Sequence, residues 1–489
     1  MKQFDLVIVG AGLSGIGTAV HVKNKLPESR VLILESRSQL GGTWDLFRYP
    51  GIRSDSDMST MSYDFRPWRE TDFVASGKRI LDYINEVAKD YKIDSLIRYN
   101  HKLIEAHWST HNKSWELIVK TPSGYSKYYT QCLDYCGGYY KYDSPFVPEI
   151  PGIEKFKSPL FHAQQWPVDF DETNKEITVI GSGATAMTLV PALSKKAKKV
   201  TMLQRSPSYV ISLPSSDPVA ELLTKLLPNQ TAQRWIKKKN IFLTYWMYKL
   251  CQRFPTLLRW TLTRLVKSNL KDLDQNLKHF APYYNPWDQR LCLIPDGDLF
   301  AAINSKKAYI ITDQIDSFSE ESINLNSGKK ISPDAVVFAT GLKLSVMDEL
   351  KLTKDGQPLN LADHITYKGM MYSDIPNFIH TFGYINSSWT LRVDLIADWV
   401  ARLIYHMKEN NLLACTPHIS PSERKMKLRP FIENFSSNYI QRDIHRFPKQ
   451  GEHWPWINPQ NYQFELKRIK DQAIEDEHLR FDDGSSLSL

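Results

Sequence analysis

Residues 5–15 read Asp-Leu-Val-Ile-Val-Gly-Ala-Gly-Leu-Ser-Gly, an apolar strand followed at once by a glycine-rich turn. A helical stretch continues to about Lys25, and residues 30–35 (RVLILE) are typical of a second strand. A strand, a GxGxxG turn, a helix and another strand make up the first half of a dinucleotide-binding unit. An acid, Glu35, ends the second strand about twenty residues after the last glycine, which is the context that makes this short motif informative.

The three glycines of this turn have separate roles. Gly10 permits the tight turn, Gly12 lets the backbone approach a pyrophosphate, and Gly15 allows the helix to pack closely. The helix that begins around Ser14 presents free N–H groups and a positive dipole end to phosphates. Glu35 would accept hydrogen bonds from ribose hydroxyls and repel a 2′-phosphate, so we expect FAD or NAD at this site and not NADP.

The same pattern returns later in the chain. Residues 176–180 predict a strand, Gly181-Ser182-Gly183-Ala184-Thr185-Ala186 the turn, and residues 199–204 the next strand. This strand ends in Gln204-Arg205-Ser206 without an acid, and a guanidinium can grip a phosphate with two hydrogen bonds. The second site is therefore predicted to bind NADPH, with Arg205 and Ser206 at the 2′-phosphate and Gln204 among the cofactor-binding residues. The alternative is that Arg205 is only a solvated charge at a strand end.

The fold class predicted from this duplication is α/β, with two Rossmann-like dinucleotide-binding domains and a helical insertion. The insertion is rich in Lys, Arg, Trp and Leu and has no strand pattern. The tail is Gly- and Ser-rich and is expected to be disordered. The predicted boundaries are 1–145 and 346–480 for the FAD-binding domain, 146–212 and 286–345 for the linker and the NADPH-binding domain, 213–285 for the insertion, and 481–489 for the tail.

The composition excludes several classes of protein. A net charge of +8 over 489 residues gives no argument for nucleic-acid binding. Five scattered cysteines predict a reducing compartment without disulfides, and the thirteen histidines show no metal-ligand spacing. No signal peptide is visible, and no uncharged apolar run reaches about 18 residues. The predicted location is the cytoplasm, with peripheral contact at the inner face of the membrane left open.

Two longer motifs resemble signatures of Baeyer–Villiger monooxygenases. Residues 42–55 fit GxWxxxxYPGxxxD through Gly42, Trp44, Tyr49, Pro50, Gly51 and Asp55. Residues 156–167 fit FxGxxxHxxxWP through Phe156, His162, Trp166 and Pro167. Ser158 stands where the family usually has glycine, which predicts a changed loop conformation. The resemblance covers most of the chain and is closest to the branch of ethionamide-activating monooxygenases and of the flavin monooxygenases of long-chain alkane growth.

The resemblance implies a reaction. NADPH reduces FAD, the reduced flavin forms a peroxide with dioxygen, and that peroxide inserts oxygen into apolar ketones or oxidises the sulfur of thioethers or thioamides. It also implies Arg290 as the active-site cation and Asp55 as the acid that holds it, and an arginine suits this role because it keeps its proton. Thr43, Trp44 and Tyr49 would line or support the flavin pocket. His162 and Trp166 would lie in the inter-domain linker, where we expect His162 to organise domain motion.

Several alternatives stay open. The enzyme could be a heteroatom oxygenase or a long-chain alkyl hydroxylase, and a rival of another class is a membrane-associated flavoprotein for binding or electron transfer. Arg290 could form a buried structural ion pair, and Asp55 could be a helix N-cap or a turn aspartate. Residues 235–267 form a basic amphipathic segment with Trp235, which we interpret as a lid with its apolar face buried, with docking in a membrane interface as the alternative.

Overall fold

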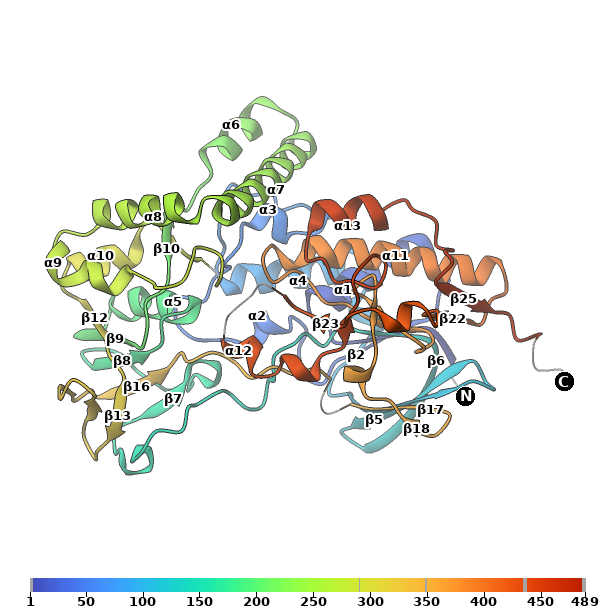
Figure 1. The fold of residues 1–489 in the computed structure, drawn as a ribbon, viewed down its shortest axis with the longest axis horizontal. Helices are drawn as coiled ribbons and strands as arrows, with labels where there is room; N and C mark the ends of the chain where they lie inside the picture. Colours follow the sequence, from blue (N-terminus) through green and yellow to red (C-terminus); the bar gives the residue numbers. More distant parts are fainter. Residues whose placement is uncertain (1–2, 290, 348–349, 434–437, 486–489) are drawn as a thin grey trace.

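Two sheets, each with its own hydrophobic core, organise the computed structural model (Figure 1). The structure describes residues 3–289, 291–347, 350–433 and 438–485, without the side chains of residues 274, 275, 438 and 439. Chain segments far apart in sequence share the first sheet, because residues 3–135 and 351–380 both contribute strands to it. The fold class predicted from the sequence is confirmed.

The first sheet has a parallel part and an antiparallel part. Its order is β18-β17-β4-β5-β6-β1-β2-β3, with β21 also paired to β6. Strand β2 (Val31–Leu34) is buried along its whole length, as expected for a parallel strand covered on both faces. Helices α1 (Leu13–Lys25) and α11 (Trp389–Glu409) pack on each other in this domain. The other strands are β1 (Gln3–Val9), β3 (Ile97–Arg98), β4 (Lys102–Ser109), β5 (Ser114–Thr121), β6 (Gly124–Tyr135), β17 (Lys351–Lys354), β18 (Gln357–Pro358) and β21 (Phe378–His380).

The second sheet is entirely parallel, in the order β12-β9-β8-β16-β7. Its strands are β7 (Leu160–His162), β8 (Glu176–Ile180), β9 (Lys199–Gln204), β12 (Ala308–Thr312) and β16 (Ala335–Phe338). Strand β7 comes from the Pro- and aromatic-rich segment between the two units and pairs with β16, so part of that segment is built into the second sheet. Helices α5 (Ala184–Leu193) and α10 (Asp298–Asn304) accompany the sheet.

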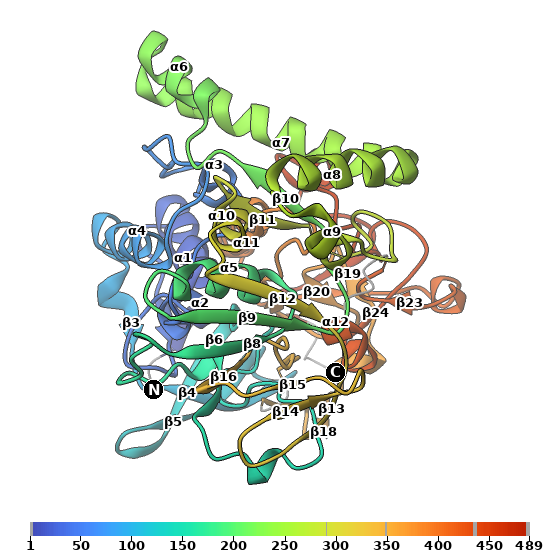
Figure 2. The ribbon, with the colours of Figure 1, turned by 90° about the vertical axis from the view of Figure 1, so that its left-hand side faces the viewer.

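A layer of helices projects from one end of the molecule (Figures 1 and 2). It consists of α6 (Pro218–Leu226), α7 (Asn229–Arg253) and α8 (Pro255–Asn269). The neighbouring strands β10 (Val210–Leu213) and β11 (Cys292–Pro295) pair with each other in parallel. Helix α7 packs on α3 (Met58–Met61), where the Asn240 amide donates to the Asp57 carboxylate over 2.9 Å.

The remaining elements are short, apart from α4. They are the helices α2 (Thr43–Leu46), α4 (Gly77–Asp90), α9 (Leu273–Asn276), α12 (Asn438–Gln441) and α13 (Tyr462–Ile469), and the strands β13 (Ile315–Phe318), β14 (Ile323–Leu325), β15 (Lys330–Ile331), β19 (Thr366–Tyr367), β20 (Met371–Tyr372), β22 (Ala414–Pro417), β23 (Arg429–Pro430), β24 (Lys449–Gln450) and β25 (Leu479–Asp482).

The expectation of a disordered tail over residues 481–489 is wrong at its first residues. Phe481 and Asp482 belong to β25, which pairs antiparallel with β22. The Phe481 ring meets that of His406 at 5.2 Å, and the Asp482 carboxylate pairs with Lys113. These contacts outweigh the Gly- and Ser-rich composition that suggested disorder. Residues 486–489 lie outside the described part of the chain.

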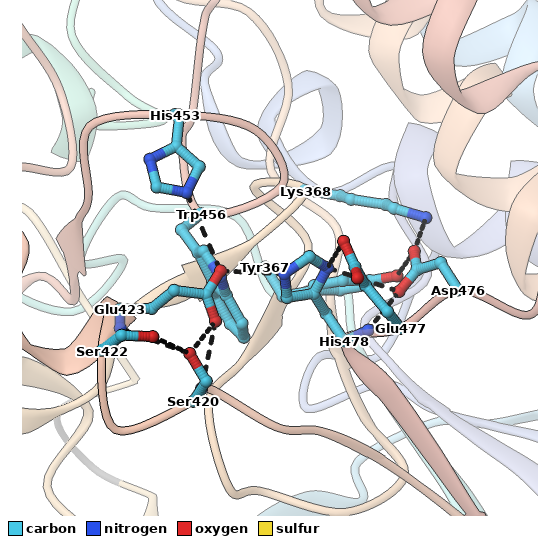
Figure 3. Close-up of polar contacts among 10 residues, drawn as sticks. All are labelled: Tyr367, Lys368, Ser420, Ser422, Glu423, His453, Trp456, Asp476, Glu477 and His478. Atoms are coloured by element: carbon cyan, nitrogen blue, oxygen red, sulfur yellow. Dashed lines mark hydrogen bonds and ion pairs between the residues drawn. The ribbon is translucent and has the colours of Figure 1, made fainter.

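A polar cluster joins residues 476–478 near the C-terminus to residues 420–423 (Figure 3). The Glu423 carboxylate accepts hydrogen bonds from the Ser420 hydroxyl at 2.7 Å and from the Trp456 indole at 2.9 Å, and His478 lies 2.8 Å away. These hydrogen bonds outweigh desolvation and lower the pKa of Glu423 to about 2. Next to it, Asp476 pairs with Lys368 at 2.8 Å. Residues 420–423 and 476–478 are thus held together by charged contacts.

Candidate functional site

A cavity of about 640 Å³ lies where the two domains meet. Its walls come from the carboxyl ends of β1, β2 and β6 in the first sheet, and from α5 and β11 beyond it. Ligands of open α/β sheets bind in the crevice at these strand ends. The predicted residues that line it are Gly10, Gly12, Ser14, Glu35, Gly42, Thr43, Trp44, Tyr49, Asp55, His162, Ala184 and Thr185.

The first glycine turn has the geometry that a pyrophosphate needs. Gly10 has φ +102°, and a Cβ on it would lie 2.8 Å from the Cys136 carbonyl oxygen. A Cβ on Gly15 would lie 1.9 Å from the Gly10 carbonyl oxygen, so only glycine lets α1 start so close to the turn. Gly12 is the N-cap of α1 and no side chain caps it, which leaves backbone N–H groups available to a phosphate.

Glu35 lies directly after β2 and is 5% exposed. One of its carboxylate oxygens accepts from the Ala11 N–H at 2.8 Å, and the other accepts from the Arg37 N–H at 2.9 Å. Burial raises the pKa of Glu35, and these hydrogen bonds oppose the shift. The carboxylate thus ties the turn to the end of β2 and lines the cavity where a ribose would lie.

A loop covering the first turn brings in a residue that sequence reasoning missed. The Gly41 N–H donates to the Ala11 carbonyl at 2.9 Å, and a Cβ on Gly42 would lie 3.2 Å from the Gly12 Cα. The Arg37 guanidinium pairs with the Asp45 carboxylate at 2.5 Å and donates to the Gly42 carbonyl at 3.2 Å. Arg37 therefore holds this loop close to the glycine turn and lines the cavity.

The Tyr49–Asp55 stretch of the first signature reaches across to the second domain. Tyr49 packs against the core of the second sheet and hydrogen-bonds the Thr185 hydroxyl. Burial raises the pKa of Tyr49 to about 12, with a smaller contribution from the charge of Asp55. Asp55 is exposed and lines the cavity. It is not the N-cap of α3, because Asp57 fills that role and accepts from the Thr60 N–H.

Arg290, the active-site cation implied by the resemblance, lies outside the described residues. The segment just before it is described: the Asn285 N–H donates to the Asp288 carboxylate at 3.0 Å. Downstream, Leu293 of β11 lines the cavity. The chain on either side of Arg290 is therefore placed, and Leu293 lines the same cavity as Asp55.

The second glycine turn repeats the geometry of the first in the other domain. Gly181 has φ +148°, and a Cβ on it would lie 2.3 Å from the Ala339 carbonyl oxygen. Gly183 is the N-cap of α5, has no side-chain cap, and has no atom within 4 Å of a Cβ built on it. The Ser182 hydroxyl accepts from the Ser208 hydroxyl at 3.2 Å. The start of α5 is open to a ligand, and Ala184 and Thr185 extend it into the cavity.

Gln204, Arg205 and Ser206, at the end of β9, differ in their surroundings. The Gln204 side chain is buried and donates to the His279 carbonyl at 2.8 Å and the Thr312 hydroxyl at 2.9 Å, so it faces the interior of its own domain. Arg205 is exposed, and no carboxylate in the described ranges forms an ion pair with it. Ser206 is half-buried beside it. Arg205 is thus the residue of this group that is free to reach an anionic ligand.

His162 ties the inter-domain segment to the second sheet. Its Nε2 lies 3.1 Å from the Gly341 carbonyl, and its Nδ1 accepts from the Gln164 N–H at 3.0 Å. The proton therefore belongs on Nε2. Burial lowers the pKa of His162 to about 4, so the ring is neutral at neutral pH. Trp166 packs edge-on against Phe161 at 5.1 Å, a packing role.

An aromatic pair at the cavity also escaped the sequence analysis. The Trp389 indole donates to the Ser14 hydroxyl at 2.9 Å and stacks on Tyr139 with 5.3 Å between ring centroids. Tyr139 and Tyr140 lie in the loop that follows the end of β6 at Tyr135, and both line the cavity. Their position at the carboxyl end of a parallel strand is the signal that would have identified them.

Metal-ligand groups and membrane-spanning helices are absent from the described residues. No group of His, Cys, Asp and Glu there is arranged to hold a metal ion, and no helix there is long and apolar enough to cross a membrane. All five cysteines are buried and unpaired. Burial raises the pKa of Cys132 to about 12, so this thiol stays protonated and unreactive.

Comparisons with known proteins identify the family of this chain. The family model described as flavin-binding monooxygenase-like matches residues 5–409. The chain is 44% identical over 481 residues to the FAD-containing monooxygenase EthA of Mycobacterium tuberculosis, covering 98% of both chains. It is 43% identical over 485 residues to the probable FAD-binding monooxygenase AlmA of Acinetobacter baylyi, covering 98% of this chain and 96% of the relative.

Solved structures show the same fold at lower identity. An oxidized steroid monooxygenase bound to NADP aligns with a TM-score of 0.78 and 19% identity over 98% of this chain and 100% of the other. OTEMO in complex with FAD and NADP aligns with a TM-score of 0.77 and 19% identity over 98% and 99%. An open structure of cyclohexanone monooxygenase aligns with a TM-score of 0.71 and 16% identity over 86% and 91%.

Proposed function

The chain belongs to the flavin-binding monooxygenase-like family, and from this premise we propose that it uses FAD and NADPH to insert one oxygen atom of dioxygen into apolar ketones. The product is an ester. The other oxygen atom leaves as water, with two electrons and a proton from NADPH and a second proton from solvent. The observation that carries the proposal is one cavity lined from both glycine units, the first followed by Glu35 and the second by Arg205.

The residues of the first unit fit FAD. Gly10, Gly12 and Gly15 form a turn in which a side chain would collide with backbone or with an approaching phosphate. Ser14 and Thr43 border the cavity beside this turn, and Glu35 would hold a ribose. Bound there, the flavin supplies electron transfer from NADPH and the activation of dioxygen. Trp44, which packs on the core of this domain, would support the ring system.

The residues of the second unit fit NADPH. Gly181, Ser182 and Gly183 precede the uncapped start of α5, which would hold the pyrophosphate, and Ala184 and Thr185 line the cavity beside it. Arg205 and Ser206 would hold the 2′-phosphate, because a guanidinium matches its geometry and charge. Gln204 supports this end of β9 from the interior. In this arrangement the nicotinamide would enter the cavity from the α5 side.

Arg290 and Asp55 complete the proposed site. Arg290 would stabilise the negative charge that develops on oxygen during insertion, since its guanidinium cannot lose its proton at neutral pH. Asp55, which lines the cavity, would hold and orient that guanidinium. His162 is neutral and would keep the inter-domain segment in register with the second sheet; it transfers no proton in this scheme.

An apolar substrate is supported by the cavity and by the neighbours. Leu293, Leu342, Met347 and Leu350 line the cavity together with aromatic rings. Two structural neighbours are a steroid monooxygenase and cyclohexanone monooxygenase. Sulfur oxidation of thioethers or thioamides is a second candidate. The chain resembles the ethionamide-activating branch, and its identity to EthA extends over nearly the whole chain.

The proposal can be tested with labelled dioxygen. Purified protein would be incubated with NADPH and a panel of short and long ketones and sulfides, and products would be analysed by mass spectrometry. One labelled oxygen in an ester is the expected result. Label confined to sulfoxides or alcohols would assign the chain to heteroatom or alkyl oxygenation instead. Hydrogen peroxide as the only product with every substrate would contradict the oxygenase proposal.

The roles of Arg290 and Asp55 have their own test. Arg290→Ala should abolish ester formation while the protein keeps its flavin absorbance. Arg69→Ala, at an exposed position outside the cavity lining, is the matched control and should keep ester formation. Ester formation retained in Arg290→Ala would remove this assignment.

A further inference from the structure

The outer face of the helical layer exposes large apolar side chains. Trp235, Phe242 and Trp246 follow one line along α7 and are 56%, 58% and 49% exposed. Leu257 and Trp260 of α8 are each 57% exposed. Residues spaced by three, four or seven positions share one face of a helix. A run of exposed aromatic rings on neighbouring helices marks a site of interaction with a protein or a membrane.

The inner face of α7 is occupied by the rest of the molecule. Ala232, Ile236 and Asn240 are buried on the side that meets α3. The Lys237 ammonium pairs with the Asp64 carboxylate at 2.6 Å, which fixes the helix to the first domain. The face with Trp235 and Trp246 therefore points away from the protein.

This arrangement does not support the lid interpretation. None of the described residues that line the 640 Å³ cavity comes from α6, α7 or α8. The aromatic rings that a lid would bury are exposed along α7, whereas α8 buries Leu262 and Val266 against the protein and leaves Leu265 44% exposed. The outer face needs another occupant.

Helices α7 and α8 carry only positive charges. Residues 229–270 contain no Asp or Glu, and the whole chain has a net charge of +8, so the rest of the chain is close to neutral. Anionic surfaces attract such a segment, and the attraction rises with each Lys or Arg near the surface. The cations are Arg234, Lys237, Lys238, Lys239, Lys249, Arg253, Arg259, Arg264 and Lys267.

The cations and the aromatic rings alternate on the same face. The Lys238 ammonium lies 5.4 Å from the Trp235 ring centroid, and the Arg264 guanidinium lies 5.3 Å from that of Trp260. Lys249 lies 5.7 Å from the Tyr245 ring. Tryptophan rings settle at the level of lipid headgroups, where neighbouring cations meet the phosphates. A helix lying in the plane of a membrane surface has this composition.

A second copy of the chain fits this face poorly. In a twofold dimer the same patch meets itself, so the exposed cations of one copy, such as Lys238, Lys249 and Arg264, would face those of the other. An anionic lipid surface satisfies both the charge and the exposed rings. We propose that the outer face of α7 and α8 docks on an anionic lipid bilayer, with Trp235, Phe242, Trp246 and Trp260 entering the headgroup region.

Vesicle binding tests the proposal, and it does not depend on the oxygenation reaction. The full-length protein would be sedimented with vesicles of phosphatidylcholine alone and with vesicles in which about one-third of the lipid is phosphatidylglycerol. The anionic lipid gives the second vesicles a strong negative surface potential. We expect partitioning at least about tenfold stronger on the anionic vesicles, weakening as salt is raised, because salt screens exposed charges. Trp235→Ser/Phe242→Ser/Trp246→Ser should lower this partitioning by about tenfold or more, since apolar burial scales with area.

Matched controls separate the patch from general charge and hydrophobicity. Lys238→Glu/Lys249→Glu/Arg253→Glu/Arg264→Glu should abolish binding to anionic vesicles. Lys195→Glu/Lys306→Glu/Lys329→Glu/Lys330→Glu changes the net charge equally on exposed residues of the second domain and should reduce binding far less. Equal losses in the two quadruple variants, or no binding by the unchanged protein, would overturn the proposal. So would a dimer in analytical ultracentrifugation that the Trp235, Phe242 and Trp246 substitutions dissociate while vesicle binding is absent.

Discussion

The Arg53 guanidinium and the Asp298 carboxylate form an ion pair, with 2.5 Å between Nη1 and Oδ2. Arg53 lies between Tyr49 and Asp55 in the first signature, and Asp298 begins α10 of the second domain. The two side chains are 15% and 30% exposed, so the pair is partly shielded from solvent. It joins the loop that lines the flavin side of the cavity to the domain that carries the second glycine turn.

Asp298→Asn is expected to loosen this junction. The amide keeps the hydrogen-bond acceptor at the start of α10 but removes the charge opposite Arg53, at a cost of about 1–2 kcal/mol for a partly exposed pair. The amount of oxygenated product per NADPH consumed should fall severalfold, because the two cofactor sites are held less firmly. The exchanged pair Arg53→Asp/Asp298→Arg should recover part of the loss. Unchanged coupling in Asp298→Asn would show that this ion pair does not align the domains.

The two glycine turns should respond differently to a methyl group. Gly15→Ala places a Cβ 1.9 Å from a backbone oxygen, so α1 must shift at a cost of about 1–3 kcal/mol or more, and the protein should lose flavin during gel filtration. Gly183→Ala meets no protein atom within 4 Å and should leave the protein folded and yellow. Its methyl group would occupy the approach to the pyrophosphate, so the KM for NADPH should rise by about tenfold or more. Flavin retained at wild-type level in Gly15→Ala would contradict the role given to this turn.

Arg205→Gln should change the choice of nicotinamide cofactor. A hydrogen bond to a charged group contributes about 1.5–3 kcal/mol, which corresponds to an increase in KM for NADPH of about 10- to 100-fold. The KM for NADH should change little, because NADH has no 2′-phosphate. Lys195→Gln, an exposed substitution in the same domain, is the control and should alter neither value. An unchanged NADPH/NADH ratio in Arg205→Gln would mean that Arg205 is only a solvated charge.

The sequence predicts those parts of the site that local chain geometry determines. The strands around both glycine turns lie within one or two residues of their expected ends, because a strand, a turn and a helix follow each other without interruption. The contact between Tyr139 and Trp389 joins residues 250 positions apart, and no periodicity in either segment predicts it. Gln204 has the expected position at a strand end, yet its side chain turns inward because His279 and Thr312 offer partners there.

The helical layer shows a second limit of sequence analysis. The amphipathic pattern of residues 235–267 predicts helices with an apolar stripe, and α7 and α8 are those helices. A stripe does not reveal which face the protein covers. In the structure Ile236 and Asn240 bind the layer to α3, so the aromatic stripe is left outside.

Glu423→Gln should destabilise the protein at neutral pH. The folded-state pKa of Glu423 is about 2, below the ordinary value of 4.5, so its contribution to stability is fully present above pH 4.5 and is lost as the pH falls toward 2. The contribution is on the order of 2–3 kcal/mol, which should lower the Tm at pH 7 by several degrees. The difference in Tm between variant and wild type should shrink steadily in scans below pH 4.5. Glu433→Gln, which removes a half-exposed carboxylate paired with Arg429, is the control and should change the Tm much less.

The buried, neutral His162 should make the folded protein less stable in mild acid. Its folded-state pKa is about 4, below the ordinary value of 6.5, so between these values the unfolded chain binds a proton that the folded chain does not. The free energy of unfolding should therefore fall as the pH drops from 6.5 to 4, by up to about 3 kcal/mol from this residue. His162→Gln keeps a donor for the Gly341 carbonyl and has no titrating ring, so its Tm should fall less than that of the wild type between pH 7.5 and pH 5. Part of the fall should remain, because burial also lowers the pKa of His279 to about 4 and that of His380 to about 3. His111→Gln, at an exposed position, is the control, and its Tm should depend on pH as that of the wild type does. If the Tm of His162→Gln fell as much as that of the wild type, His162 would be protonated in the folded protein without cost.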